Sequence, residues 1–353
     1  MYFNGLGTAV PPRRYTQREC WEALRASACY AALNRRAQFI LEQVLCGNNG
    51  IATRHLALET LAEVFTIDPD VLHRRFLRHA PRLAEQAARA ALADGGLRTH
   101  AIDAVIASTC TGYLCPGISS YLIEGLGLRR EVLAFDLVGQ GCGAAVPNWQ
   151  MAEALIAAGR AANVLSVCVE VCSATMYLDD DPGVLISACL FGDGAGAAVL
   201  SRAAMERRRP VRWMTGATVT DPARRDLLRF EQRGGLLRNI LAKPVPQVAA
   251  ELVQGVFERV LADAGVPPSA IREWIWHAGG RDVLLALKER LGLEDAHIAR
   301  SREVLRHYGN LSSAFVYFVL QSALRDAAPG GLWWVSSFGA GFSCHGALLD
   351  VAG

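Results

Sequence analysis

Three polar residues that lie far apart in this sequence carry side chains suited to acyl-transfer chemistry. Cys142 stands between two glycines, soon after the apolar run of residues 132–138. His277 ends a strand-like segment, and Asn310 lies in the small-residue stretch 308–313. A thiol, an imidazole and an amide are a nucleophile, a base and a hydrogen-bond donor. The three together predict an enzyme that acts on thioesters.

The position of Cys142 favours a reactive thiolate. A cysteine at a helix N-terminus faces free backbone N–H groups and the positive end of the helix dipole. A nearby imidazolium lowers the pKa of such a thiol further, into the range of roughly 3.5 to 7.5. The alternative is a small apolar residue packed at a strand–helix junction, which we expect for most of the other nine cysteines.

His277 and Asn310 suit the stabilisation of negative charge on oxygen. Small residues follow His277 and leave space beside its ring. A neutral imidazole there pairs with Cys142 and donates to a carbonyl oxygen, and the Asn310 amide donates while uncharged at every relevant pH. Together they predict an oxyanion hole for the thioester enolate that forms when a malonyl group loses carbon dioxide.

The elements that must position these residues alternate between strand-like and helix-like patterns. The segments 104–110, 164–171 and 195–201 are short and almost wholly apolar, as in strands covered on both faces. A helix is predicted to begin near Pro81 and to stop at the glycines 95–96. The pattern predicts a layered α/β fold.

One spacing recurs in both halves of the chain. Cys142 lies 33 residues after Thr109, and Asn310 lies 33 residues after His277. Coincidence is the weaker explanation, because a Phe-Gly pair before an apolar strand also occurs in each half, at 191–192 and at 338–339. We therefore expect duplicated βαβαβ units that meet around a pseudo-two-fold axis and bring the three residues to one centre.

The halves are predicted to span residues 1–203 and 204–353. The charged run 205–210 lies between them, and it is too short to act as a flexible linker. We expect the halves to pack as one body.

Composition excludes several function classes. The chain has 353 residues, 52% of them hydrophobic and 20% charged, with a formal net charge of +2. A charge this small, and basic runs as short as 207–209, argue against a nucleic-acid partner. The N-terminus does not resemble a signal peptide, and no apolar window is long enough to span a membrane. These features predict a cytoplasmic protein.

The ten cysteines are spread through apolar segments without the spacing of a disulfide framework, so we expect reduced thiols. Cys168 and Cys172 are four residues apart, which places both on one face of a strand. No histidine stands near them, and we predict no metal site.

Several motifs resemble those of the chalcone synthase-like, or type III, polyketide synthases. They are the segments around Cys142, 190–194, 276–280, 301–314 and 337–341, and the similarity extends from about residue 54 to the C-terminus. The resemblance implies the thiolase fold, with duplicated βαβαβ halves in a five-layered αβαβα core. It also implies a homodimer and a catalytic triad of Cys142, His277 and Asn310.

The same resemblance implies a reaction. An acyl-CoA starter is loaded on Cys142, malonyl-CoA is decarboxylated, and the chain is extended iteratively and cyclised to a pyrone- or resorcinol-type product. Coenzyme A thioesters are the substrates, and no metal, nucleotide or flavin cofactor is implied.

Further positions match residues that bind substrate in this family. Phe191 matches a gatekeeper, Cys110 and Thr111 match residues that shape product choice, and Cys115 matches a residue that lines the partner's cavity. The loop containing Phe338, Gly339 and Gly341 matches the loop that lines the cyclisation cavity, and Arg54 matches a basic contact for the coenzyme A phosphates. The second gatekeeper is expected near residues 237–239, where this sequence has no phenylalanine. Gly143 replaces a bulkier residue, which predicts extra room beside Cys142.

Three alternatives share the fold. A ketoacyl synthase III-like enzyme would perform one condensation with acyl carrier protein. A thiolase would need a second catalytic cysteine, for which only Cys344 is available. A non-catalytic scaffold would have no chemical reason to retain Cys142, His277 and Asn310 together.

Overall fold

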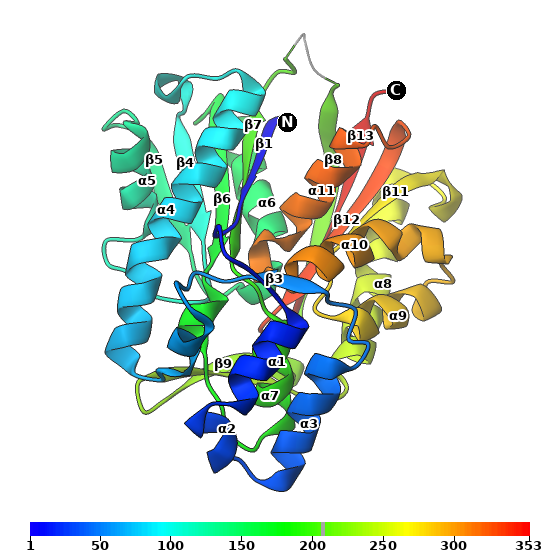
Figure 1. Cartoon of the computed structure of the whole chain (residues 1–353). Coiled ribbons are helices and arrows are strands. Elements are labelled where there is room, and N and C mark those ends of the chain that lie inside the picture. The colour runs from blue at the N-terminus through cyan, green and yellow to red at the C-terminus, as the bar shows by residue number, and fades with distance from the viewer. Residues whose placement is uncertain (206–208) are drawn as a thin grey trace.

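A computed structural model describes residues 1–205 and 209–353, so residues 206–208 of the expected connection between the halves lie outside the described residues. A nine-stranded sheet in the order β11-β12-β13-β8-β1-β7-β6-β4-β5 forms the centre of the molecule (Figure 1). Its strands are β1 Tyr2–Ala9, β4 Ala104–Ser108, β5 Leu133–Leu137, β6 Asn163–Glu170, β7 Gly194–Ser201, β8 Val211–Thr220, β11 Ile271–Trp276, β12 Gly331–Gly339 and β13 Ser343–Val351.

The sheet consists of two leaves with matching topology. In the first leaf β1 and β7 are antiparallel, β7 and β6 are antiparallel, and β6 and β4 are parallel. In the second leaf β8, β13, β12 and β11 follow one another with the same relative directions. The leaves join where Tyr2 of β1 pairs with Arg212 of β8. The first leaf carries one further strand, β5, parallel to β4 at the sheet edge.

Helices cover both faces of each leaf. Within β4, Val105 and Ala107 pack with α4, whereas Ala104 and Ile106 pack with the central helices. This alternation explains why the strands are apolar throughout. Helices α6 (Ala145–Ala157) and α11 (Phe315–Arg325) lie between the leaves, in contact with strands of both. The outer layers are α4 Pro69–Gly95 and α5 Ile118–Leu126 on one side, and α8 Val245–Ala264, α9 Arg281–Arg290 and α10 Asp295–Tyr308 on the other.

The expected helix start at Pro81 is wrong. Helix α4 begins twelve residues earlier, where Asp68 accepts a hydrogen bond from the Val71 N–H and Pro69 occupies the first turn. Pro81 lies inside the helix, where burial of an alanine-rich face keeps the helix intact despite the lost donor. The predicted end is confirmed, because Gly96 adopts the left-handed conformation with φ of 61°.

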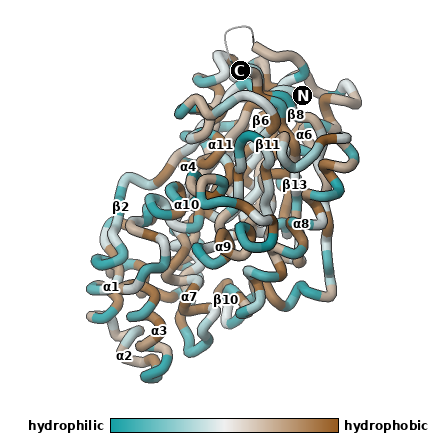
Figure 2. The backbone as a smooth tube through the Cα atoms, turned by 90° about the vertical axis from the view of Figure 1, so that its right-hand side faces the viewer, coloured by the Kyte–Doolittle hydropathy of each residue, from teal (hydrophilic) through white to brown (hydrophobic). Residues whose placement is uncertain are grey.

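A smaller layer lies at one end of the leaves (Figures 1 and 2). It contains three N-terminal helices, one helix from the insertion between β6 and β7, and two short ribbons. Helices α1, α3 and α7 share one apolar cluster there. The elements are α1 Gln17–Arg25, α2 Ala28–Ala32, α3 Arg35–Cys46, α7 Pro182–Leu190, β2 Arg14–Thr16, β3 Thr53–His55, β9 Leu228–Arg233 and β10 Leu236–Leu241.

Candidate active site

Cys142 lies in a one-turn 3-10 helix, Gly141–Gly143, immediately before α6. The turn is tight: Gly141 has a φ of 53°, and Gly339 of β12 packs so closely on the turn that a Cβ there would overlap the backbone around Cys142. Ser337 of the same strand donates a hydrogen bond to the Gly143 carbonyl at 2.8 Å. The second leaf therefore fixes the position of a nucleophile that the first leaf carries.

His277 follows β11 directly, and only 1% of it is exposed. Its ring packs edge-on against Phe315 and Phe338, with centroid distances of 5.6 and 4.9 Å. Among the described residues neither ring nitrogen has a hydrogen-bond partner. A buried imidazole held by apolar contacts alone keeps both nitrogens available for a substrate.

Asn310 lies between α10 and α11, with its side-chain amide held in one orientation. The Oδ1 atom accepts from the Ser312 N–H at 2.8 Å, and Nδ2 donates to the Gly279 carbonyl at 3.1 Å. An amide nitrogen carries two hydrogens, so one remains for a ligand.

Cys142, His277 and Asn310 all line one cavity of about 800 Å³, which we call the outer cavity. Its other walls come from α3, α7, the β9–β10 ribbon and α9.

The thiol of Cys142 is ready to ionise. Hydrogen bonding from the Cys110 thiol is the largest cause that holds the pKa of Cys142 well below its usual value. Burial opposes this effect, while His277 and the Ser312 hydroxyl, 3.2 Å from the sulfur, lower the pKa further. Cys142 is partly accessible, as a nucleophile must be.

A buried carboxyl group beneath Cys142 was missed by the sequence analysis. Glu170 ends β6, is fully buried, and accepts hydrogen bonds from the hydroxyls of Thr111 at 2.8 Å and Ser312 at 3.2 Å, and from Ser313. Burial raises the pKa of Glu170. Hydrogen bonding to Cys142, burial and the Glu170 charge raise the pKa of Cys110 well above its usual value. A lone glutamate in an apolar strand gives no sequence signal for this role.

The positions expected to shape the product lie around a second space. An inner chamber of about 80 Å³ is lined by Cys110, Thr111 and Ser312 at one end and by apolar residues of α1 and α3 at the other. Phe191 lines both the inner chamber and the outer cavity, and so does Asn239. Phe191 therefore lies where a gatekeeper is expected.

The second gate position lies within the expected range 237–239 and is occupied by Asn239. Asn239 of β10 faces the junction, and its side chain donates to the Ser187 hydroxyl at 2.9 Å. Its cross-strand partner on β9 is Phe230, which lines the inner chamber. An aromatic side chain is therefore present, but it comes from the neighbouring strand, which spacing along the sequence could not indicate.

The remaining expected residues separate into two groups. Phe338 lines the outer cavity, Gly339 packs against the turn of Cys142, and Gly341, with φ of 128°, lies in the loop between β12 and β13. Cys115 is exposed and lines neither cavity.

Two expectations need correction. Arg54 is only 5% exposed, and its guanidinium donates to the carbonyls of Ala188 and Phe191, both at 2.9 Å. It is therefore not a surface contact for phosphates. Gly143 does not provide extra room, because a Cβ there would meet the ring of His345. His345 is 2% exposed in β13.

Among the described residues no cluster of histidine, cysteine, aspartate or glutamate could hold a metal ion, and no helix is long and apolar enough to cross a membrane. All ten cysteines are free thiols.

Solved structures share this fold. 1,3,6,8-Tetrahydroxynaphthalene synthase from Streptomyces coelicolor A3(2), a bacterial type III polyketide synthase, superposes with a TM-score of 0.89, 24% identity and complete coverage of both chains. A polyketide synthase from the brown alga Ectocarpus siliculosus also gives a TM-score of 0.89, with 26% identity, 99% of this chain and 97% of the other. The chain therefore has the thiolase fold of these enzymes, as expected.

Sequence comparisons agree. The family profile described as FAE1/Type III polyketide synthase-like protein matches residues 34–255, and the profile of the chalcone and stilbene synthase C-terminal domain matches residues 229–349. The chain is 33% identical to 1,3,6,8-tetrahydroxynaphthalene synthase of Streptomyces peucetius subsp. caesius, over 97% of this chain and 91% of that protein. It is 27% identical to 3,5-dihydroxyphenylacetyl-CoA synthase of Streptomyces toyocaensis, over 98% and 89%. On this combined sequence and structural similarity, the chain belongs to the type III polyketide synthases.

Proposed function

We propose that this protein loads an acyl-CoA starter on Cys142, decarboxylates malonyl-CoA, and extends and cyclises the chain to a pyrone- or resorcinol-type product. The observation that supports it most is the outer cavity, which contains a partly accessible thiol of lowered pKa. His277 and Asn310 line the same cavity, and each has hydrogen-bonding capacity that no partner among the described residues uses. Only coenzyme A thioesters are needed as substrates, without a metal or redox cofactor. A cytoplasmic location fits such substrates.

The side chains divide the reaction between them. The Cys142 thiolate attacks the acyl-CoA carbonyl, a new C–S bond forms, and coenzyme A leaves as its thiolate. When malonyl-CoA loses carbon dioxide, the electron pair of the broken C–C bond moves to the thioester oxygen. His277 and Asn310 then donate to that enolate oxygen. The enolate carbon attacks the acyl group, and Cys142 is released to accept the extended chain again.

Basic residues at the rim of the outer cavity replace Arg54 as candidates for the phosphates of coenzyme A. Arg36 of α3 and Lys243 before α8 are exposed there, and Arg281 begins α9 on the same rim. Positive side chains around a wide opening attract a substrate that carries several phosphate charges.

We also propose a homodimer through the β5 edge. Tyr113 is 72% exposed and Val138, just beyond β5, is 68% exposed. Ser119 binds Asp136 of β5 with both its N–H and its hydroxyl, so the loop that carries Tyr113 and Cys115 leads into a helix tied to this strand. An unpaired strand edge beside large exposed apolar side chains is a common protein interface. Two halves, 1–203 and 204–353, remain our proposed domain division.

The reaction is tested by incubating the protein with malonyl-CoA and an acyl-CoA starter. Release of carbon dioxide is expected for the wild type, and a loss of roughly 10²- to 10³-fold in kcat for Asn310→Ala, which removes one donor to the enolate. Mass spectrometry should then detect a pyrone or resorcinol.

Asn163→Ala is the matched control, because Asn163 bonds a backbone carbonyl at the start of β6, away from the site. Equal release from wild type and Asn310→Ala would mean that the assigned triad is wrong. A single β-ketoacyl product formed on acyl carrier protein would support the ketoacyl synthase alternative instead.

A further inference from the structure

Helix α7 separates the two cavities. Pro182, Gly183, Ile186 and Leu190 line the outer cavity, and they share one face of the helix. Residues of the opposite face line the inner chamber, namely Val184, Ser187, Ala188 and Cys189. This two-sided exposure to apolar space explains why α7 lacks a polar face. Its end residue, Phe191, borders both cavities.

The C-terminal end of α7 is held by Arg54. The last carbonyls of a helix have no partner within the helix, and here other elements satisfy them. Arg54 binds the carbonyls of Ala188 and Phe191, both at 2.9 Å, and Gln17 binds that of Cys189 at 3.0 Å. Gln17 also accepts from the Arg54 Nε at 3.1 Å, which orients the guanidinium.

The same end is joined to the candidate catalytic amide. The Asn310 N–H donates to the Leu190 carbonyl at 2.9 Å, and the Gly192 N–H donates to the Asn310 carbonyl at 3.0 Å. No carboxylate forms an ion pair with Arg54 within the described residues, so its charge is matched by the helix C-terminus. Arg54 therefore fixes Phe191 and, through this end of α7, the backbone of Asn310.

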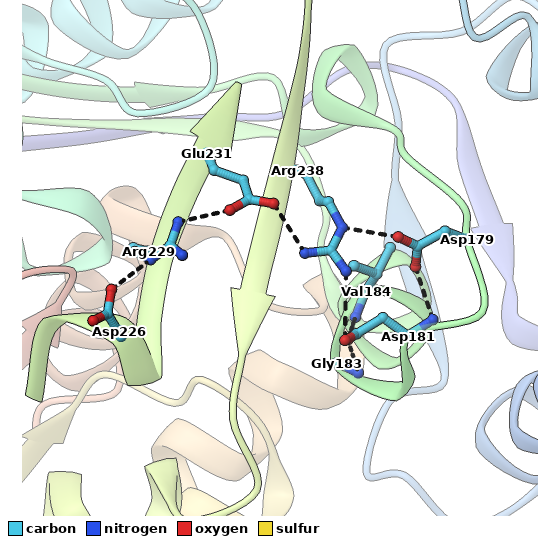
Figure 3. Close-up of polar contacts among 8 residues, drawn as sticks. All are labelled: Asp179, Asp181, Gly183, Val184, Asp226, Arg229, Glu231 and Arg238. Atoms are coloured by element: carbon cyan, nitrogen blue, oxygen red, sulfur yellow. Dashed lines mark hydrogen bonds and ion pairs between the residues drawn. The ribbon is translucent and has the colours of Figure 1, made fainter. Parts of the chain in front are cut away.

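The N-terminal end of α7 is held by Arg238 (Figure 3). Asp181 caps the helix by accepting from the N–H groups of Gly183 and Val184. Arg238 of β10, whose side chain is 11% exposed, pairs with Asp179 at 2.8 Å and Asp181 at 3.4 Å. A third carboxylate, Glu231 of β9, lies 3.2 Å from Arg238.

Arg238 also stands beside the gate residue Asn239 on β10. Adjacent strand residues point to opposite faces, so Arg238 faces the acidic residues while Asn239 faces the junction of the cavities. The close packing of Gly183 on the Leu241 carbonyl leaves no side-chain space between α7 and β10. The ion pairs therefore hold ribbon and helix in one arrangement.

We propose that Arg54 and Arg238 are positioning residues that fix the two ends of α7 as the wall between the outer cavity and the inner chamber. They thereby determine which acyl groups pass Phe191 and Asn239. This proposal rests on the proposed function, because it concerns the acyl chain carried by Cys142. Neither arginine takes part in bond making or breaking.

The two arginines predict different kinetic signatures. Arg238→Gln removes the ion pairs at the N-terminal end of α7. It leaves the hydrogen bonds between the C-terminal end and Asn310 in place. The ratio of kcat/KM for hexanoyl-CoA and lauroyl-CoA is expected to change by at least roughly fivefold, a size typical of altered pocket contacts. The kcat for malonyl-CoA decarboxylation is expected to stay within about twofold, since ground-state positioning of the starter is not part of that step.

Arg54→Lys keeps the charge but loses the planar fork that spans two carbonyls. Because the same helix end holds Asn310, two quantities are expected to change. They are the ratio of kcat/KM for hexanoyl-CoA and lauroyl-CoA, which we call the starter ratio, and the kcat for decarboxylation. A loss of stability alone would lower the active fraction for every substrate equally and would leave the starter ratio unchanged.

The matched control is Arg300→Gln. Arg300 is also a half-buried arginine with two carboxylate partners, Glu273 and Asp326, but it lies on α10 away from α7. If Arg238→Gln does not fold, Asp179→Asn removes one of its partners from a more exposed position. An unchanged starter ratio in the folded variants would overturn the proposal. If the wild type itself releases no carbon dioxide, the proposed function fails instead.

Discussion

Cys142 and Cys110 are neighbouring thiols with opposite acid–base character. The pKa of Cys142 lies well below its usual value, chiefly because of hydrogen bonding from Cys110. The pKa of Cys110 is raised by that bond, by burial and by Glu170. The thiolate form of Cys142 is therefore favoured, and so is the protonated form of Cys110. The same hydrogen bond favours ionisation of Cys142 and opposes ionisation of Cys110.

This asymmetry predicts selective alkylation. With iodoacetamide at pH 7, Cys142 should react first, and its rate should reach a plateau below the pH at which an ordinary thiol ionises. Cys110 should remain unmodified. In His277→Ala the midpoint should move to higher pH, since the imidazole that lowers the pKa of Cys142 is lost.

Peptide mapping by mass spectrometry across pH 5 to 10 provides the measurement, with the exposed Cys46 as an internal comparison. A Cys142 profile that matches that of Cys46 would contradict the assignment.

At the residue level, the equal spacing of motifs in the two halves predicted which residues meet at the site. The shared 33-residue spacing correctly predicted that Cys142, His277 and Asn310 line one cavity, although the first stretch contains α5 and β5 and the second contains α9 and α10. Glu170 and Phe230 could not be found this way. Their roles depend on burial and on cross-strand pairing, which become visible only in three dimensions.

Strand β13 contains His345, a buried histidine that makes the stability of the fold depend on pH. Burial lowers the pKa of His345 to about 4, and its Nδ1 lies 3.0 Å from the Thr218 hydroxyl of the neighbouring strand β8. The ring packs beside Gly143, so β13 supports the turn that carries Cys142. Protonation of this imidazole in the interior would place an unpaired charge there.

The folded protein should therefore lose stability as the pH falls. The unfolded chain binds a proton near pH 6.5, whereas folded His345 does so only near pH 4. Between these values the unfolded state holds more protons, so the free energy of unfolding decreases on acidification, by about 3 kcal/mol in total from this group. His345→Gln should flatten that part of the profile.

Urea unfolding at a series of pH values from 7 to 4 measures this effect. His100→Gln, at an exposed position, serves as the control. An equal pH dependence in wild type and His345→Gln would show that other groups dominate.

Element boundaries were predictable where the sequence carries a local stop signal. The end of α4 at Gly96 followed from glycine, but its start did not, because Pro81 is tolerated inside a buried helix. Helix α7 carries no stop signal of that kind at its C-terminal end, where Phe191 follows Leu190. Its helical form depends on Asp181 at one end and on Arg54, distant in sequence, at the other.

For the molecule as a whole, the β5 edge predicts self-association. Light scattering after size-exclusion chromatography should give twice the chain mass of 38.1 kDa. The double variant Tyr113→Lys with Val138→Lys should shift it to the monomer, since charges cannot be buried in an apolar contact. Phe39→Lys changes an apolar residue on α3 that is 60% exposed and should leave the dimer intact. A wild type that stays at 38.1 kDa at every concentration would contradict the dimer.

The two leaves share α6 and α11, so the central core of the molecule belongs to both leaves. The sequence predicted the duplicated architecture well and the small end layer poorly. The leaves follow a repeated pattern, whereas α1, α2, α3 and α7 have no second copy from which to infer their form.

The position of α7 has a consequence for how such an enzyme diversifies. Some of its side chains border the outer cavity, which Cys142 also lines, and others border the inner chamber beside Cys110 and Thr111. A change at Ile186 alters one volume, and a change at Ala188 alters the other, without touching Cys142, His277 or Asn310. We therefore expect substitutions on the two sides of this nine-residue helix to change the two volumes separately.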